Sequence, residues 1–151
     1  MAVLIWWLLT AVGPEAHAGV APHIALALAA LLPSATLLAA MILVQMGARG
    51  VTGAIEPLAG NDSFFLRTNQ RAITNTVEQL AVFAPALLAL AAGVPAARMA
   101  PIVALAYVFA LARLAFWIGY LAGTLRRAPG MAATVVVNVA TLGAAAWVWL
   151  A

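Results

Sequence analysis

The segment that decides the fold is Arg71–Val94, with the sequence RAITNTVEQLAVFAPALLALAAGV, in which a polar beginning leads into a long apolar run. At helical spacing Arg71, Asn75 and Glu78 occupy positions i, i+4 and i+7, so their side chains project from one face. Arg67 extends that face by one turn. We therefore expect a membrane-spanning helix with a charged face at its beginning, which is suited to binding a charged, zwitterionic ligand.

The composition of the whole chain is that of an integral membrane protein. Of its 151 residues, 67% are hydrophobic and 7% are charged, and the mean hydropathy is +1.11. All 7 basic residues are arginines, a density too low for a nucleic-acid-binding surface. The chain contains no cysteine, so neither a disulfide nor a thiolate metal site is expected, and any thiol chemistry would be carried by a bound substrate.

The apolar residues gather into four segments, each long enough to cross a bilayer. These segments cover about 22–47, 72–94, 99–122 and 129–150. The connection over 48–70 is long and contains several glycines, whereas the other two connections are short. The predicted fold class is all-α, an integral membrane four-helix bundle that forms one domain over 22–151. Residues 1–21 form an apolar lead-in, too short to span the membrane and expected at its interface.

The arginines are distributed unevenly between the two ends of this bundle. Arg98 belongs to the end that holds both termini, as do His17 and His23, which lie too far from the other arginines to join them. The opposite end holds Arg49, Arg67, Arg71, Arg126 and Arg127. Because positively charged connections stay in the cytoplasm, we expect both termini on the non-cytoplasmic side of a bacterial inner membrane. Interface anchors at that side would be Trp6, Trp7, Trp147 and Trp149.

The third segment carries a second polar face that ends at the arginine-rich side. This face consists of Arg113, Trp117, Tyr120, Thr124 and Arg127. Arg113 lies about three turns inside the segment and needs a partner there, for which Glu78 is a candidate. A purely structural interpretation stays open, because Glu78 can neutralise an arginine, and Arg126 and Arg127 can act as topology signals at a helix end.

Together these residues resemble the MAPEG family, the membrane-associated proteins in eicosanoid and glutathione metabolism, which includes microsomal glutathione transferases and leukotriene C synthase. The resemblance covers about 22–150 and rests on Arg71-x-x-x-Asn75-x-x-Glu78 and on Tyr107-Val-Phe-Ala-Leu-Ala-Arg113 followed by Gly119-Tyr120 and Arg126-Arg127-Ala-Pro129. The chain departs from the leukotriene synthase at Phe116, where that enzyme has a tyrosine, and at Gln79, where an aromatic residue is expected. The contacts that these two positions make with glutathione would therefore differ from those in the leukotriene synthase.

The resemblance implies a homotrimer that binds glutathione as co-substrate between neighbouring subunits, near the cytoplasmic face. The residues that would bind glutathione are Arg49, Arg71, Asn75, Glu78, Arg113 and Tyr120. In this alignment Glu78 would meet the amino group of glutathione, and Arg127 would stabilise its thiolate. If the motif is counted back from Pro129 instead, Arg126 is the residue that would stabilise the thiolate.

From these features we predict a membrane-embedded glutathione transferase, or a peroxidase, with a role in detoxification. A permanently charged guanidinium favours the thiolate form of a nearby thiol, and Pro129 at the expected first turn of the last helix would bring a helix N-terminus close. The second substrate would be a lipophilic electrophile drawn from the membrane lipids. Two alternatives remain: a non-catalytic lipid-binding scaffold of the same fold, and a small proton-coupled exporter that uses Glu78. Arg71 beside Glu78 opposes the exporter, because it would repel cations.

Overall fold

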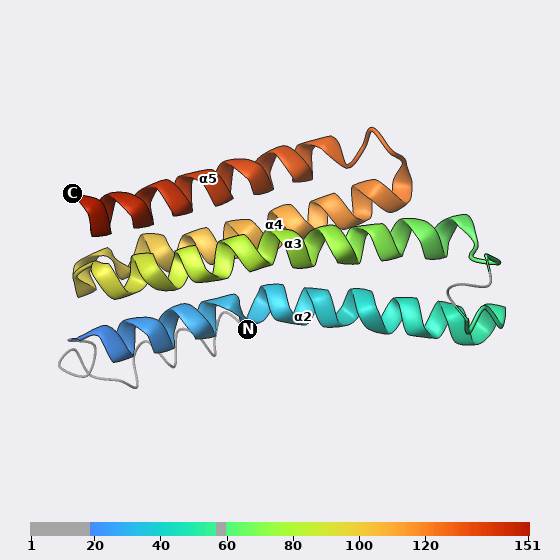
Figure 1. Cartoon of the computed structure of the whole chain (residues 1–151), viewed down its shortest axis with the longest axis horizontal. Coiled ribbons are helices and arrows are strands. Elements are labelled where there is room, and N and C mark those ends of the chain that lie inside the picture. Colours follow the sequence, from blue (N-terminus) through green and yellow to red (C-terminus); the bar gives the residue numbers. More distant parts are fainter. Residues whose placement is uncertain (1–18, 57–59) are drawn as a thin grey trace.

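The computed structural model describes residues 19–56 and 60–151. Its long helices are α2 (Val20–Thr52), α3 (Phe64–Gly93), α4 (Met99–Ala122) and α5 (Ala128–Leu150), and a short 3-10 helix, η3 (Ala96–Arg98), precedes α4. The long helices run alternately up and down and lie side by side (Figure 1). Each is long and apolar enough to cross a membrane. The predicted all-α four-helix membrane bundle is confirmed, whereas the lead-in over 1–21 lies almost wholly outside the described residues.

The first two helices extend further than the hydrophobic pattern predicts, so the first connection spans 53–63 rather than 48–70. α2 ends where Gly53 adopts a left-handed conformation with φ 69°, which glycine reaches without steric cost. α3 begins after Ser63, whose Oγ accepts a hydrogen bond from the backbone N–H of Leu66 at 3.2 Å. The prediction was wrong here because polar residues interrupt the apolar pattern in the outer turns: Arg49 and Thr52 in α2, and Arg67–Gln70 in α3.

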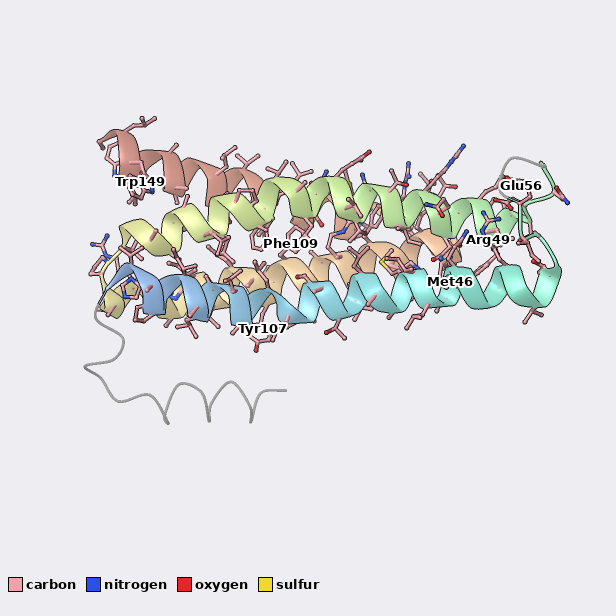
Figure 2. All side chains as sticks on the ribbon, turned by 60° about the horizontal axis from the view of Figure 1, so that its bottom comes forward. Met46, Arg49, Glu56, Tyr107, Phe109 and Trp149 are labelled. Carbon is pink, nitrogen blue, oxygen red and sulfur yellow. The ribbon has the colours of Figure 1, made fainter. Side chains whose placement is uncertain are left out.

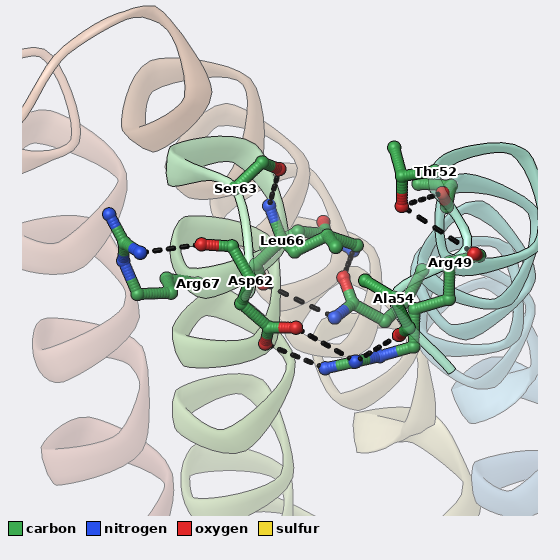
Figure 3. Close-up of polar contacts among 10 residues, drawn as sticks. Arg49, Thr52, Ala54, Asp62, Ser63, Leu66 and Arg67 are labelled. Carbon is green, nitrogen blue, oxygen red and sulfur yellow. Dashed lines mark hydrogen bonds and ion pairs between the residues drawn. The ribbon is translucent and has the colours of Figure 1, made fainter. Parts of the chain in front are cut away.

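Arg49 closes the first connection with an ion pair (Figure 3). Its Nη1 and Nη2 donate to the two carboxylate oxygens of Asp62 at 2.9 and 2.8 Å, and Nη1 also donates to the carbonyl of Ala54 at 2.8 Å. Arg67, in the first turn of α3, donates to the backbone carbonyl of Asp62. A two-pronged pair of this kind fixes orientation as well as distance, so the end of α2 and the start of α3 are held together.

The two longer helices extend past the two shorter ones at one end of the bundle. α2 has 33 residues and α3 has 30, against 24 in α4 and 23 in α5. At about 1.5 Å per residue, α2 is roughly 50 Å long, well beyond the ~30 Å apolar layer of a bilayer. Figure 1 shows the excess length of α2 and α3 projecting beyond the α4–α5 connection. The result is a step at the end of the bundle that carries most of the arginines.

Small residues and aromatic rings pack the helices closely. Phe83 of α3 and Phe109 of α4 stack with their ring centroids 4.1 Å apart, in the half of the bundle away from the step. Nearer the step, Gly130 brings α5 against the backbone of α4, and a Cβ at this position would lie 2.3 Å from the backbone nitrogen of Phe116. Backbone approach of this kind is a common basis of helix association in lipid. The α4–α5 pair is therefore tightly joined beside the step.

The outer surface of the bundle is apolar along most of its length. Leu43 and Leu111 are 66% and 64% exposed, as expected of side chains solvated by lipid. Figure 2 shows Arg49 and Trp149 at opposite ends of the bundle, and the indole N–H of Trp149 donates to the carbonyl of Ala89 at 2.9 Å. A surface of this kind is stable in a bilayer, so the chain is an integral membrane protein.

Candidate functional site

A cavity of about 680 Å³ opens at the step, between α3, the α4–α5 connection and the facing turns of α4 and α5. Four residues singled out from the sequence line it: Arg71, Asn75, Tyr120 and Arg127. The other lining residues are Phe116, Thr124, Leu125, Ala128, Met131 and Ala132. The cavity therefore combines two guanidinium groups with a largely apolar wall.

Arg127 is held against this wall by Tyr120. The Cζ of Arg127 lies 4.4 Å from the centroid of the Tyr120 ring, which is a cation–π geometry. Tyr120 in turn packs against the ring of Phe116, with centroids 5.6 Å apart. Pro129 occupies the first turn of α5, as predicted, and Arg127 is the residue that precedes the helix. The positive end of the α5 dipole thus adds to the charge of Arg127 at this wall.

The two arginines that line the cavity have no carboxylate partner among the described residues. In residues 19–56 and 60–151, neither Arg71 nor Arg127 forms an ion pair, whereas Arg49 does. Glu78 lies one turn beyond Asn75 on the exposed face of α3, and the Nδ2 of Asn75 approaches its Oε2 at 3.5 Å. Glu78 lies outside the cavity lining. Exposed charges on a membrane helix are costly unless a ligand or another subunit covers them.

Arg113 lies behind the cavity wall, fully buried, rather than in the lining. Its Nη2 donates to the Oδ1 of Asn75 at 3.0 Å and to the Oγ1 of Thr76 at 2.7 Å, and its Cζ lies 4.1 Å from the centroid of the Phe116 ring. The expected pairing of Arg113 with Glu78 is therefore wrong. Asn75 and Thr76 face α4, whereas Glu78 is exposed, so the amide and the hydroxyl meet the guanidinium first. Arg113 orients Asn75, and its Nε and Nη1 have no hydrogen-bond partner within the part of the chain that the structure describes.

Arg49 and Arg126 are also separate from the cavity lining. Arg49 is engaged by Asp62 in the first connection. Arg126 is exposed and its side chain does not line the cavity, although its neighbour Arg127 does. The sequence motif did not decide between Arg126 and Arg127. In the structure, Arg127 lines the cavity and Arg126 does not.

A buried hydrogen-bond network, which the sequence analysis did not identify, supports the cavity from the side of α2. The indole N–H of Trp117 donates to the Oδ1 of Asn69 at 2.7 Å, and the Nδ2 of Asn69 donates to the Oε1 of Gln45 at 2.9 Å. Gln45 in turn donates to the carbonyl of Leu66 at 3.2 Å. The network joins α2, α3 and α4. The sequence pattern did not indicate this network, because the predicted second helix began at 72 and Asn69 was therefore assigned to a connection.

The fold and the site define a class: a four-helix integral membrane protein with a positively charged, partly apolar cavity at one end of its bundle. The sequence model of the MAPEG family matches residues 21–147. The chain belongs to the MAPEG family, whose members include glutathione transferases, and the resemblance seen in the sequence motifs is confirmed. No curated protein matches the chain.

Proposed function

We propose that this protein is a membrane-embedded, glutathione-dependent transferase that forms the glutathione thiolate beside Arg127. The observation that carries the proposal is the pair Arg71 and Arg127, which line one cavity and have no carboxylate partner among the described residues. Glutathione carries carboxylate groups that a guanidinium recognises and a thiol that a positive charge activates. The family supports the same conclusion, since it includes glutathione transferases.

In this proposal each residue around the cavity recognises a different part of glutathione. Arg71 pairs with a carboxylate of the tripeptide, and Asn75, oriented by Arg113, hydrogen-bonds to its backbone. Glu78 receives the ammonium group, which needs an anionic partner. Tyr120 provides a flat apolar wall and a hydroxyl, while Arg49 reaches the tripeptide bound to a neighbouring subunit, with Asp62 holding its side chain in place.

The chemical step follows from the position of Arg127. Its guanidinium cannot lose its proton near neutral pH, so it favours the thiolate, and the thiol proton passes to water. The sulfur then attacks an electrophilic carbon of a lipophilic substrate that lies against Phe116 and Met131. A C–S bond forms, and the leaving group departs with the electrons of the bond that breaks. Peroxidase activity toward a lipid hydroperoxide would start from the same thiolate.

A homotrimer would account for the charges that a single chain leaves on its outer face. Arg71 and Glu78 are exposed on α3, and exposed charges are unfavourable at membrane depth. A neighbouring subunit would cover them and close the open side of the cavity. In a bacterial inner membrane, the arginine-rich end would face the cytoplasm and both termini the opposite side. Glutathione would then reach the cavity from the cytoplasmic water.

Thiolate absorbance after rapid mixing of glutathione with the purified protein tests the proposal. The wild-type protein should give a saturable rise in absorbance, which Arg127→Ala should remove and Arg126→Ala should preserve. No signal in the wild type, together with no heat on titration with millimolar glutathione, would contradict the proposal and favour the lipid-binding scaffold. Proton-coupled uptake of a lipophilic cation that Glu78→Gln abolishes would favour the exporter instead.

A further inference from the structure

A second cavity, of about 370 Å³, lies at the end of the bundle opposite the step. Pro22, His23 and Leu26 line it from the beginning of α2, and Met99 and Val103 line it from the beginning of α4. It shares no lining residue with the cavity proposed for glutathione. The transferase reaction therefore does not account for it.

His23 places an unpaired polar atom at this cavity. Its side chain is 6% exposed, and within residues 19–56 and 60–151 its Nε2 has no hydrogen-bond partner. Buried polar groups in folded proteins are normally paired, because an unpaired one loses the hydrogen bonds that water provided. A ligand in the cavity that His23 lines would supply the missing partner.

The beginning of α2 lies at this cavity, is not capped by a side chain, and has no acidic residue in its first turn. α4 differs, because it continues from η3 and the N–H of Met99 already donates to the carbonyl of Ala96. Free amide groups at a helix beginning and the positive end of the helix dipole both attract anions. Together with His23, they favour a ligand with an anionic headgroup.

The remainder of the cavity wall suits one hydrocarbon chain. Leu26, Met99 and Val103 belong to the apolar core or pack against it. A cavity of 370 Å³ is near the lower end of the roughly 300–1,000 Å³ typical of small-molecule sites, which fits a single acyl chain better than the two chains of a phospholipid. We propose that this cavity binds a fatty acid, with its carboxylate at the Nε2 of His23 and the beginning of α2, and its chain against Leu26 and Val103.

Binding of dodecanoate to the full-length protein in nanodiscs, measured by equilibrium dialysis, tests this proposal. The wild type should bind it saturably. His23→Leu should weaken binding about tenfold or more, the effect of losing a hydrogen bond to a charged group, and His23→Gln, which keeps an N–H donor, should weaken it less. Val103→Trp should abolish binding by filling the cavity. The matched control is Val136→Trp on α5, where the side chain is 66% exposed, and it should bind as the wild type does.

The headgroup is tested with dodecanol and dodecyltrimethylammonium, which should bind at least about tenfold more weakly than dodecanoate, because they lack the anion that the beginning of α2 attracts. Equal binding of these amphiphiles would overturn the proposal, and so would equal affinity of the wild type, His23→Leu and Val103→Trp. Binding of dodecyl phosphate in place of dodecanoate would overturn the assignment of the carboxylate.

Two controls keep this test separate from folding and from the transferase proposal. His23→Leu removes an unpaired buried atom, so without ligand it should unfold at or above the wild-type temperature. Loss of dodecanoate binding then reports on the cavity and not on a disrupted bundle. His23→Leu should also keep the glutathione-dependent thiolate signal, since Arg127 lies at the opposite end of the helix bundle.

Discussion

The guanidinium carbon of Arg127 lies 4.4 Å from the centroid of the Tyr120 ring, and within the described ranges no carboxylate pairs with Arg127. An ion pair would direct the N–H groups of the guanidinium toward a permanent anion. The aromatic face instead holds the cation and leaves its N–H edges available. The arrangement suits the stabilisation of an anion that is present for only part of a reaction cycle, as a thiolate would be.

Replacing Arg127 with alanine should lower kcat for conjugation of chlorodinitrobenzene roughly a hundredfold, the scale on which a single anion-stabilising group contributes. Glutathione binding, measured by calorimetry, should change little because Arg71 and Asn75 remain at the cavity. Arg126→Ala is the control, since Arg126 is equally basic but not part of the lining. If Arg126→Ala alone removes turnover, the role belongs to the preceding residue.

Replacing Glu78 with alanine should weaken glutathione binding about tenfold or more, the effect of one lost hydrogen bond to a charged group. The physical reason is the loss of an anionic partner for the ammonium group of the tripeptide. Calorimetry with glutathione that lacks this amino group provides the control: it should bind the wild type and Glu78→Ala equally. A variant that weakens both ligands to the same extent would show that Glu78 does not contact the ammonium.

Arg113→Met should raise the KM for glutathione several-fold with little effect on stability. The substitution releases Asn75, but it also removes the buried Nε and Nη1 atoms, which have no partner among the described residues. Removing a buried guanidinium that has no carboxylate partner among the described residues relieves its desolvation cost, which offsets the two lost hydrogen bonds. The unfolding temperature in detergent should therefore stay near that of the wild type.

A double variant separates positioning from direct contact. If Arg113 acts through Asn75, then Arg113→Met combined with Asn75→Ala should raise KM no more than the larger single effect. Independent, additive increases in KM would show that Arg113 acts on glutathione by another route.

Gly130→Ala should destabilise the bundle by about 1–3 kcal/mol, the cost of overpacking a filled interior. The added Cβ would lie 2.3 Å from the backbone nitrogen of Phe116, and backbone cannot rotate away as a side chain can. Gly143→Ala on the same helix is the matched control, because nothing lies within 4 Å of its Cβ. It should be neutral or slightly stabilising, since alanine favours helix. Thermal unfolding in detergent measures both, and equal tolerance would contradict the close α4–α5 contact.

Sequence patterns were sufficient for the order of the helices, because each apolar run is bounded by polar or glycine-containing turns. The third and fourth segments, expected at 99–122 and 129–150, correspond to Met99–Ala122 and Ala128–Leu150. The beginning of α3 was missed because the polar run Arg67–Gln70 separates Phe64–Leu66 from the apolar segment, although the cap at Ser63 marks the true beginning. Hydropathy detects the part of a helix that lies in lipid, not the part that protrudes.

Part of the candidate site could be predicted from the spacing of residues within one helix. Helical spacing alone places Arg71 and Asn75 on one face, and the structure brings both to the cavity. The expected face from Arg113 to Arg127 is wrong at its end: α4 ends at Ala122, so the α4–α5 connection, and not helical spacing from Tyr120, places Arg127 at the cavity. The partner of Arg113 was not predictable, because it depends on how far each helix is rotated about its own axis. Residue spacing along one helix carries no information about that rotation.

At this end of the bundle α4 and α5 stop short of α2 and α3 (Figure 1), so the cavity that Arg127 and the α4–α5 connection line lies on a ledge that the shorter pair of helices leaves. Molecules dissolved in water would approach this ledge along the bundle axis, and molecules dissolved among acyl chains would approach it from the side. Two compounds that share no solvent can thus meet at one place without a channel through the protein.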